Sequence, residues 1–349
     1  MKKTLPWLAA WAFTALGAQH VHAATTTYSF SSAGASGKTG PIQAQIDAAY
    51  ANSALAGKVV ALSTGIQQWI VPTSGLYTIT ASGASGGYTA NALGGRGASL
   101  TVQQQLLAGH TIQILVGEEG GRASVNSGSA SAGGGGGGTF IYDATDSKLI
   151  LVAGGGGGAA QGSGFSTLNG GDASLANVTS GANGISSPYS WGAAGVGGAN
   201  GNGGLRPSYG GAGGGGFIAN GQGGNAYAGG GGTSFLNGGQ GGANLTWYGA
   251  LTLNVAGGFG GGAGAGMHSN FEANAGGGGG YSGGGGGGTR VGAGGGGGNY
   301  YTGDFLNFAY NTGNGSAIFT SAVPEPETYA MMLAGLSLMA GVARRRKQK

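Results

Sequence analysis

Seven runs of four to six glycines impose the strongest constraint on how this chain can fold. Glycine accounts for 89 of the 349 residues, and the runs lie at 133–138, 154–158, 213–216, 229–232, 276–280, 283–288 and 294–298. Because glycine has no side chain, such runs are either flexible linkers or segments packed too closely to admit a Cβ. Four runs lead within three residues into Phe or Val, in "GGGGGGTF", "GGGGFI", "GGGGTSF" and "GGGGGGTRV". This recurrence of a large apolar residue after a run favours packed segments, although the linker alternative remains open.

The packed form that we expect is a bundle of polyproline-II-like glycine helices. These helices have three residues per turn and no internal hydrogen bonds, so every N–H and C=O must find a partner on a neighbouring segment. Collagen is disfavoured because the chain has only seven prolines and no strict Gly-X-Y register. Calcium-binding nonapeptide repeats are disfavoured too, since "GGDASLANV" at 170–178 lacks the G-x-G-x-D spacing and does not recur.

Short β-branched and aromatic segments alternate with the glycine runs and predict strands. They lie at 26–31, 58–63, 67–71, 76–81, 98–104, 111–117, 139–142, 148–153, 250–255 and 316–320. In "GLYTITAS", Leu76, Thr78 and Thr80 face one way, while Tyr77 and its alternate neighbours face the other. About ten such segments predict an all-β fold, an antiparallel sandwich or jelly roll.

The N-terminus has the form of a secretory signal peptide. Lys2 and Lys3 precede an apolar stretch at 5–18, and small residues at Ala23 and Ala24 offer cleavage sites. We therefore expect residues 1–23 to be removed, leaving a glycine-rich domain at 24–321 and a tail at 322–349.

The tail has three parts of its own. Pro324, Glu325 and Pro326 precede a 15-residue apolar run at 329–343, and a basic cluster follows that includes Arg344, Arg345 and Arg346. Fifteen helical residues span about 22 Å, which is short for a hydrocarbon core of about 30 Å. The tail resembles the PEP-CTERM sorting signals of Gram-negative bacteria. That resemblance implies recognition and cleavage by an exosortase-type membrane protease, with a permanent C-terminal anchor as the alternative.

Charge and cysteine content narrow the classes of function. Residues 24–323 contain seven Lys or Arg and eight Asp or Glu, a formal charge of −1, and the basic residues are dispersed. Nucleic-acid binding is disfavoured because it needs a clustered basic face. The chain has no cysteine, so packing and backbone hydrogen bonds must hold the exported protein together.

The segment "SSAGASGKTGPIQAQ" at 31–45 raises the question of nucleotide binding, because Gly37, Lys38 and Thr39 match the end of a phosphate-binding loop. The first glycine of that motif is replaced by Ser32, and Pro41 stands where the helix should already run. We therefore expect no nucleotide and no other cofactor.

Several longer motifs resemble the glycine-rich extracellular domain of the anaplastic lymphoma kinase and leukocyte tyrosine kinase receptors. They are "FSSAGASGKTGPIQAQIDAAYANS", "GIQQWIVPTSGLYTITASGASGG", "GGGGGGTFIYD" with "LILVAGGGGGA", and "GGFGGG" with "GGGGGYSGGGGGGT". The resemblance implies a tumour-necrosis-factor-like jelly roll with long loops packed as glycine helices. It departs from the receptor pattern at Ala33 and Ile46, where the receptors have cysteines. We do not expect the receptors' ligand binding to transfer, since we recognise no kinase, transmembrane or ligand-binding partner region in this sequence.

The sequence predicts no catalytic site and no metal site. His110 and His268, the two histidines after the signal, do not suffice for a metal site, and His110 is expected to be an exposed turn residue. Glu118 and Glu119 are expected to face solvent and to pair with Arg96 or Arg122. Trp69 is expected in the core. The scattered aromatics are expected to wedge between glycine helices or else to stack on sugars: Tyr189, Trp191, Tyr209, Trp247, Tyr281, Tyr300 and Tyr301.

These observations predict an exported, non-enzymatic protein of the cell surface or extracellular matrix. A structural or adhesive role with exopolysaccharide or another surface protein as partner suits it best. The alternatives are a specific extracellular ligand-binding module and, third, a glycan-active enzyme. The expected location is outside the inner membrane of a Gram-negative bacterium.

Overall fold

Two antiparallel sheets form a sandwich in the computed structural model. The model describes residues 24–123, 130–163, 166–188, 192–223, 229–243, 245–246, 255–269 and 272–323, together with 335–337, 339 and 344. The first sheet has the order β1 (Ala24–Phe30), β19 (Ser316–Val323), β4 (Gly75–Ser82), β5 (Gly97–Leu106) and β18 (Asp304–Asn311). The second has the order β17 (Tyr300–Tyr301), β9 (Lys148–Ala153), β8 (Thr139–Asp143), β6 (Thr111–Leu115), β3 (Gln67–Ile70) and β2 (Val59–Ala61).

The inward faces of both sheets share one hydrophobic core. Alternate residues of β4 are buried, including Tyr77 and Ile79, and they pack in the same cluster as Ile112 and Ile114 of β6. Trp69 lies at the centre, with its ring centroid 4.9 Å from that of Tyr28 and 5.2 Å from that of Phe319. The expectation that Trp69 belongs to the core is therefore confirmed. Helix α1 (Gln43–Tyr50) contributes Ile46 and Tyr50 to the same cluster.

Nine of the ten predicted strand segments are strands in the structure, and the tenth, at 250–255, lies largely outside the described residues. The strand β18 was not predicted. Its sequence DFLNFAYN pairs with β5 along the edge of the first sheet, and most of its residues are exposed. The long central strands β4 and β5 are in register from Gly75–Leu106 to Ser82–Ser99. The all-β sandwich is confirmed, whereas the finer jelly-roll topology stays a prediction.

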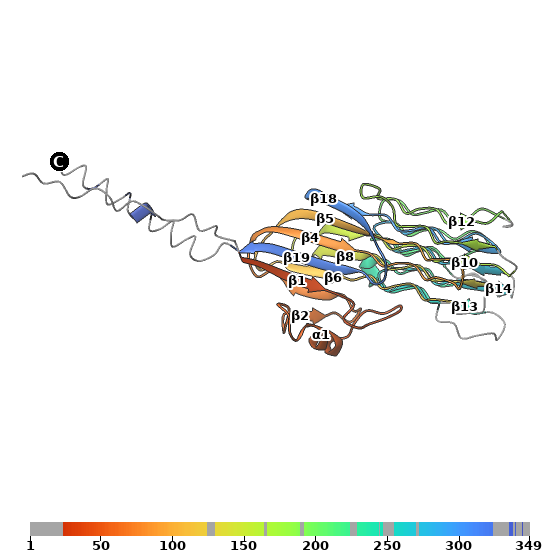
Figure 1. Ribbon diagram of the computed structural model, residues 1–349, viewed down its shortest axis with the longest axis horizontal. Coiled ribbons are helices and arrows are strands. Elements are labelled where there is room, and N and C mark those ends of the chain that lie inside the picture. Colours follow the sequence, from red (N-terminus) through yellow and green to blue (C-terminus); the bar gives the residue numbers. More distant parts are fainter. Residues whose placement is uncertain are drawn as a thin grey trace, which may run out of the picture. The chain divides into compact units, whose positions relative to one another are not determined.

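The glycine-rich segments contribute two further small sheets. One has the order β11 (Thr167–Leu168), β10 (Ala160–Gln161) and β7 (Ser131–Ala132). The other has the order β12 (Ile185–Ser186), β16 (Val291–Ala293), β15 (Glu272–Asn274), β14 (Gly266–Ser269) and β13 (Leu245–Thr246). A short 3₁₀ helix, η1 (Phe235–Asn237), lies between two glycine segments. Figure 1 shows β10, β12, β13 and β14 gathered at one end of the sandwich. Residues 27–321 form one compact unit.

The described glycine runs are buried, and their backbones bond to runs distant in the sequence. Gly155 N donates to Gly279 O at 2.7 Å, and Gly279 N donates to Gly136 O at 2.9 Å. Gly136 N in turn donates to Gly156 O at 2.8 Å. These three hydrogen bonds link the runs 133–138, 154–158 and 276–280 to one another. This satisfies the backbone groups that the absence of internal hydrogen bonds would leave open. The runs are packed segments and not linkers, while the polyproline-II-like conformation stays a prediction.

Backbone carbonyls occupy the space that side chains would need. A Cβ built on Gly285 would collide with the carbonyl of Gly195, and one on Gly297 would collide with that of Gly279. Most glycines of the runs meet a backbone carbonyl in this way. A backbone carbonyl cannot move out of the way as a flexible side chain can. This explains why only glycine occupies these positions.

Replacing Gly285 by valine should destabilise the protein. The branched side chain has no room beside Gly195, and overpacking costs about 1–3 kcal/mol or more. We expect Gly285→Val to lower the melting temperature by several degrees in a thermal melt followed by circular dichroism.

Gly75 provides the matched control. It begins β4 and has nothing within 4 Å of a built Cβ, so Gly75→Val should leave the melting temperature nearly unchanged. Equal melting temperatures for wild type and Gly285→Val would show that this run is not tightly packed.

Candidate functional site

The Gly37–Lys38–Thr39 segment joins the sandwich to the glycine region. The carbonyl of Gly37 accepts a hydrogen bond from Phe259 N at 2.7 Å, and that of Lys38 accepts one from Gly241 N at 2.9 Å. A phosphate loop instead presents N–H groups at the start of a helix. Here α1 begins at Gln43, beyond Pro41. The segment therefore serves as a structural turn, and the absence of nucleotide binding stays a prediction.

The two adjacent glutamates have different environments. Glu119 forms an ion pair with Arg122, with 2.6 Å between Oε2 and Nη2. This confirms one of the two expected pairings. The other expected partner, Arg96, pairs with Asp172 at 2.6 Å and lies over the ring of Tyr310. The prediction that Glu118 faces solvent is wrong.

Glu118 is fully buried where the chain leaves the sandwich. It follows the buried strand β6, its N–H donates to Phe259 O at 2.8 Å, and its carbonyl accepts from Gly137 N at 2.9 Å. Within the described part of the chain neither carboxylate oxygen has a hydrogen-bond partner. Burial raises the pKa of Glu118 to about 8, because removal from water disfavours the charged form. The side chain is therefore largely protonated at neutral pH.

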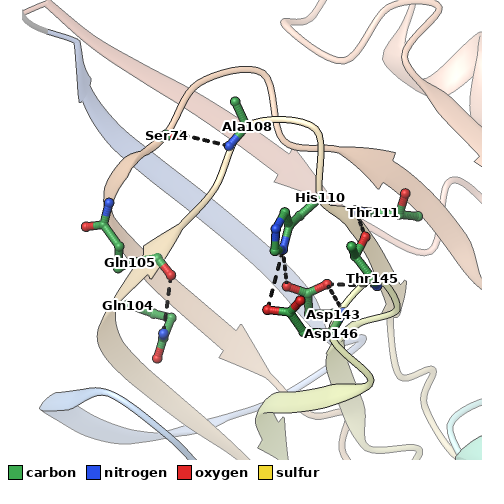
Figure 2. Close-up of polar contacts among 9 residues, drawn as sticks. All are labelled: Ser74, Gln104, Gln105, Ala108, His110, Thr111, Asp143, Thr145 and Asp146. Atoms are coloured by element: carbon green, nitrogen blue, oxygen red, sulfur yellow. Dashed lines mark hydrogen bonds and ion pairs between the residues drawn. The ribbon is translucent and has the colours of Figure 1, made fainter.

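His110 lies against two carboxylates, which sequence reasoning missed. It precedes β6, while Asp143 ends β8 and Asp146 lies in the turn between β8 and β9 (Figure 2). The His110 Nδ1 is 2.8 Å from Asp143 Oδ2 and 3.8 Å from Asp146 Oδ2. The side chain of His110 is 17% exposed and that of Asp143 is 9% exposed. His110 directly follows a turn at 108–109, as expected, but the prediction that its side chain is exposed is wrong. The bond from Asp143 raises the pKa of His110 above its ordinary value.

Strand pairing brings this cluster together. The strands β6 and β8 are antiparallel, with Ile112 opposite Asp143, so the residues flanking β6 and β8 meet at one end of the sheet. Ala144 N donates to Thr111 O at 2.9 Å, and Thr111 N donates to Thr145 Oγ1 at 2.9 Å. These bonds hold the two turns against each other. No sequence signal marks this pairing, because residues 116–138, which include β7 and a glycine run, separate β6 from β8.

The outward face of the first sheet is almost uncharged. Its strands β1, β19, β4, β5 and β18 are all described and contain one charged residue, Asp304 at the edge. Hydroxyl pairs run across β4 and β5: Thr80 and Thr101 are 2.9 Å apart between Oγ1 atoms, and Ser82 and Ser99 are 2.8 Å apart between Oγ atoms. Hydroxyl and amide groups of β4 and β5 are partly exposed on this face, while Leu76 of β4 and Phe305 and Leu306 of the edge strand β18 expose apolar side chains.

Aromatic residues of the glycine region stack on one another. Tyr281 lies 4.8 Å from Tyr300 between ring centroids, and Phe217 lies 5.5 Å from Phe235 with an interplanar angle of 19°. Tyr281 and Tyr300 both pack against the buried cluster that contains Phe140 and Phe259, while wedging between glycine helices stays a prediction. Tyr209 is 59% exposed. Tyr189, Trp191 and Trp247 lie outside the described residues, as does the side chain of His268.

The tail matches a known sorting signal. The PEP-CTERM protein-sorting motif matches residues 322–347. The motif indicates that the protein is exported, sorted to the cell surface and processed by exosortase, a membrane protein. Ala23, Pro324, Glu325, Pro326, Arg345 and Arg346 lie outside the described residues, while Ala24 begins β1. Among the helices of the described residues, none is long and apolar enough to cross a bilayer.

About a quarter of the chain shows a likeness to a receptor. The leukocyte tyrosine kinase receptor of Mus musculus is 42% identical over 95 residues, which are 26% of this chain and 11% of the receptor. The chain thus matches about a ninth of the receptor's length. The match supports the expected resemblance in part.

Glu118 makes a testable contribution to pH-dependent stability. Its pKa is about 8 in the folded protein against an ordinary value of 4.5, so the folded state binds more protons between these values. Stability therefore falls as pH rises from 4.5 to 8, by on the order of 4 kcal/mol in total. We expect Glu118→Gln, which cannot ionise, to gain stability relative to wild type across this range. Urea denaturation at pH 5, 6, 7 and 8 measures the difference.

Glu119→Gln is the control, because Glu119 is paired at the surface and should show no such trend. A constant difference between wild type and Glu118→Gln from pH 5 to 8 would contradict an elevated pKa at Glu118.

Proposed function

We propose that this chain is a non-enzymatic structural or adhesive protein of the cell surface, and that it adheres to neutral exopolysaccharide. The sorting motif supports a place at the surface. The packed glycine segments support a rigid scaffold, because their hydrogen bonds join runs far apart in the sequence. The observation that supports adhesion in addition to a structural role is the uncharged outward face of the five-stranded sheet.

The chemistry of that face suits a neutral carbohydrate polymer. Adjacent strands lie about 4.8 Å apart and alternate residues about 6.7 Å apart, so hydroxyls recur on a regular grid. Thr78, Thr80, Thr101 and Gln103 lie on this grid and are partly exposed. Hydroxyl and amide groups both donate and accept hydrogen bonds, as sugar hydroxyls do. An anionic polymer would find no cationic side chain in these five strands.

Binding to insoluble polysaccharide tests the adhesive role. We expect the protein to co-sediment with at least one neutral polymer, such as cellulose or a β-1,3-glucan, and not with alginate, an acidic polymer. Thr80→Glu combined with Thr101→Glu should weaken retention severalfold, because a charge in the array must be desolvated on contact.

Asn52→Glu adds one negative charge at an exposed site after α1, away from this face, and should bind as wild type does. The proposal that this face binds polysaccharide would be contradicted by no retention on any neutral polymer. It would also be contradicted by retention that the Thr80 and Thr101 changes leave unaltered. One tight and selective protein or glycan ligand would instead favour the ligand-binding module that the receptor likeness suggests.

We also propose that exosortase processing removes the tail. Pro324, Glu325 and Pro326 precede the apolar run, so cleavage beside them would leave residues 24–325 or slightly fewer. We expect intact-mass analysis of protein released from the cell surface to show no residues after about Glu325. A mass that still includes Arg344, Arg345 and Arg346 would indicate a retained anchor.

A further inference from the structure

We propose that His110, Asp143 and Asp146 form a binding site for a divalent cation of the zinc class. This inference goes beyond the adhesive role and does not depend on it. One ligand atom from each residue, an imidazole nitrogen or a carboxylate oxygen, lies within 4.8 Å of the others. Zinc binds such atoms at about 2.0–2.2 Å, so two ligands of one ion are at most about 4.4 Å apart. A small rotation of the most exposed side chain closes the difference.

Asp143 is held in place for such a role. Its Oδ1 accepts hydrogen bonds from Thr145 N at 2.9 Å and from Asp146 N at 3.2 Å. These two bonds fix the carboxylate while its Oδ2 is directed at His110 (Figure 2). A ligand whose orientation is set by neighbouring donors loses little freedom when it binds an ion.

Asp146 supplies the adjustable ligand. Its side chain is 58% exposed, and its Oδ2 is 3.8 Å from His110 Nδ1. It can therefore turn toward an ion without disturbing the core. His110, by contrast, is anchored through its backbone, since Val71 N donates to His110 O at 2.9 Å.

A pocket opens beside the three residues and gives an ion access. It encloses about 200 Å³, and its walls include His110, Asp143 and Asp146 together with Gln104, Gln105 and Lys148. The three candidate ligands therefore lie in the wall of this pocket. Three protein ligands would leave a coordination position directed at this pocket, as zinc sites with three protein ligands do.

The donor set selects among cations. One imidazole and two carboxylates suit zinc and neighbouring transition metals, whereas Ca²⁺ and Mg²⁺ prefer oxygen ligands alone. The two carboxylates bring two negative charges, and Lys148 brings one positive charge at the pocket wall. Lys148 is exposed, so its ammonium can remain in water. The bound ion would link the turn before β6 to the turn after β8.

Calorimetry tests the site directly. Purified full-length protein without a histidine tag is titrated with ZnCl₂, and separately with MgCl₂, in buffer free of chelators. We expect saturable binding of one Zn²⁺ per chain and much weaker binding of Mg²⁺. His110→Gln and Asp146→Asn should each weaken Zn²⁺ binding at least about tenfold.

Two controls keep the test decisive. Asp47→Asn changes an exposed carboxylate on α1 and should bind Zn²⁺ as wild type does. Melting temperatures in the absence of metal check that His110→Gln and Asp146→Asn are folded; Asp146 is exposed, so Asp146→Asn should match wild type. No saturable Zn²⁺ binding, equal binding of Mg²⁺, or wild-type affinity in both site variants would overturn the proposal.

Discussion

Backbone hydrogen bonding between glycine segments is the interaction on which the larger part of this fold depends. Each bond contributes only about 0.5–1.5 kcal/mol net, and each glycine loses more conformational freedom on folding than any other residue. The segments can therefore be stable only as a set, in which nearly every N–H and C=O is paired across runs. Gly136 illustrates this, since its N–H bonds to Gly156 and its carbonyl accepts from Gly279. Removing one segment would leave buried polar groups on several others.

The sandwich provides the fixed end from which this network extends. Phe259 is buried beside Leu115, Phe140 and Phe235. Its N–H donates to Gly37 O at 2.7 Å, and its carbonyl accepts from Glu118 N at 2.8 Å. One aromatic residue of the glycine region thus joins the opening turn and the end of β6. A hydrophobic anchor of this kind supplies the burial that glycine itself cannot, which explains why aromatic residues recur after the runs.

Local pattern was sufficient for the sandwich strands and insufficient for the sites. Alternation predicted β4 correctly because one face is buried against the second sheet. β18 was missed because its residues are mostly exposed and show no clear alternation in burial. Glu118 was assigned to solvent from its charge alone, yet the chain continues there from a buried strand into packed glycine. His110 and Asp143 are 33 residues apart in sequence, and only the register of β6 with β8 makes them neighbours.

The two halves of the fold divide the chemistry between them. Glycine runs expose few side chains and leave no room to add one, so they can set distances and stiffness but cannot recognise a ligand by side-chain chemistry. The recognition that we propose lies in the sandwich, where strands expose alternate residues on a fixed grid and turns gather polar groups at their ends. The uncharged face and the cluster at His110 both lie there, on the first sheet and at one end of the second. Because the sandwich has few charges, the two carboxylates beside His110 stand out as a local concentration of charge. A protein built in this way can vary its recognition surface through the sandwich while the glycine network, which tolerates almost no substitution, stays the same.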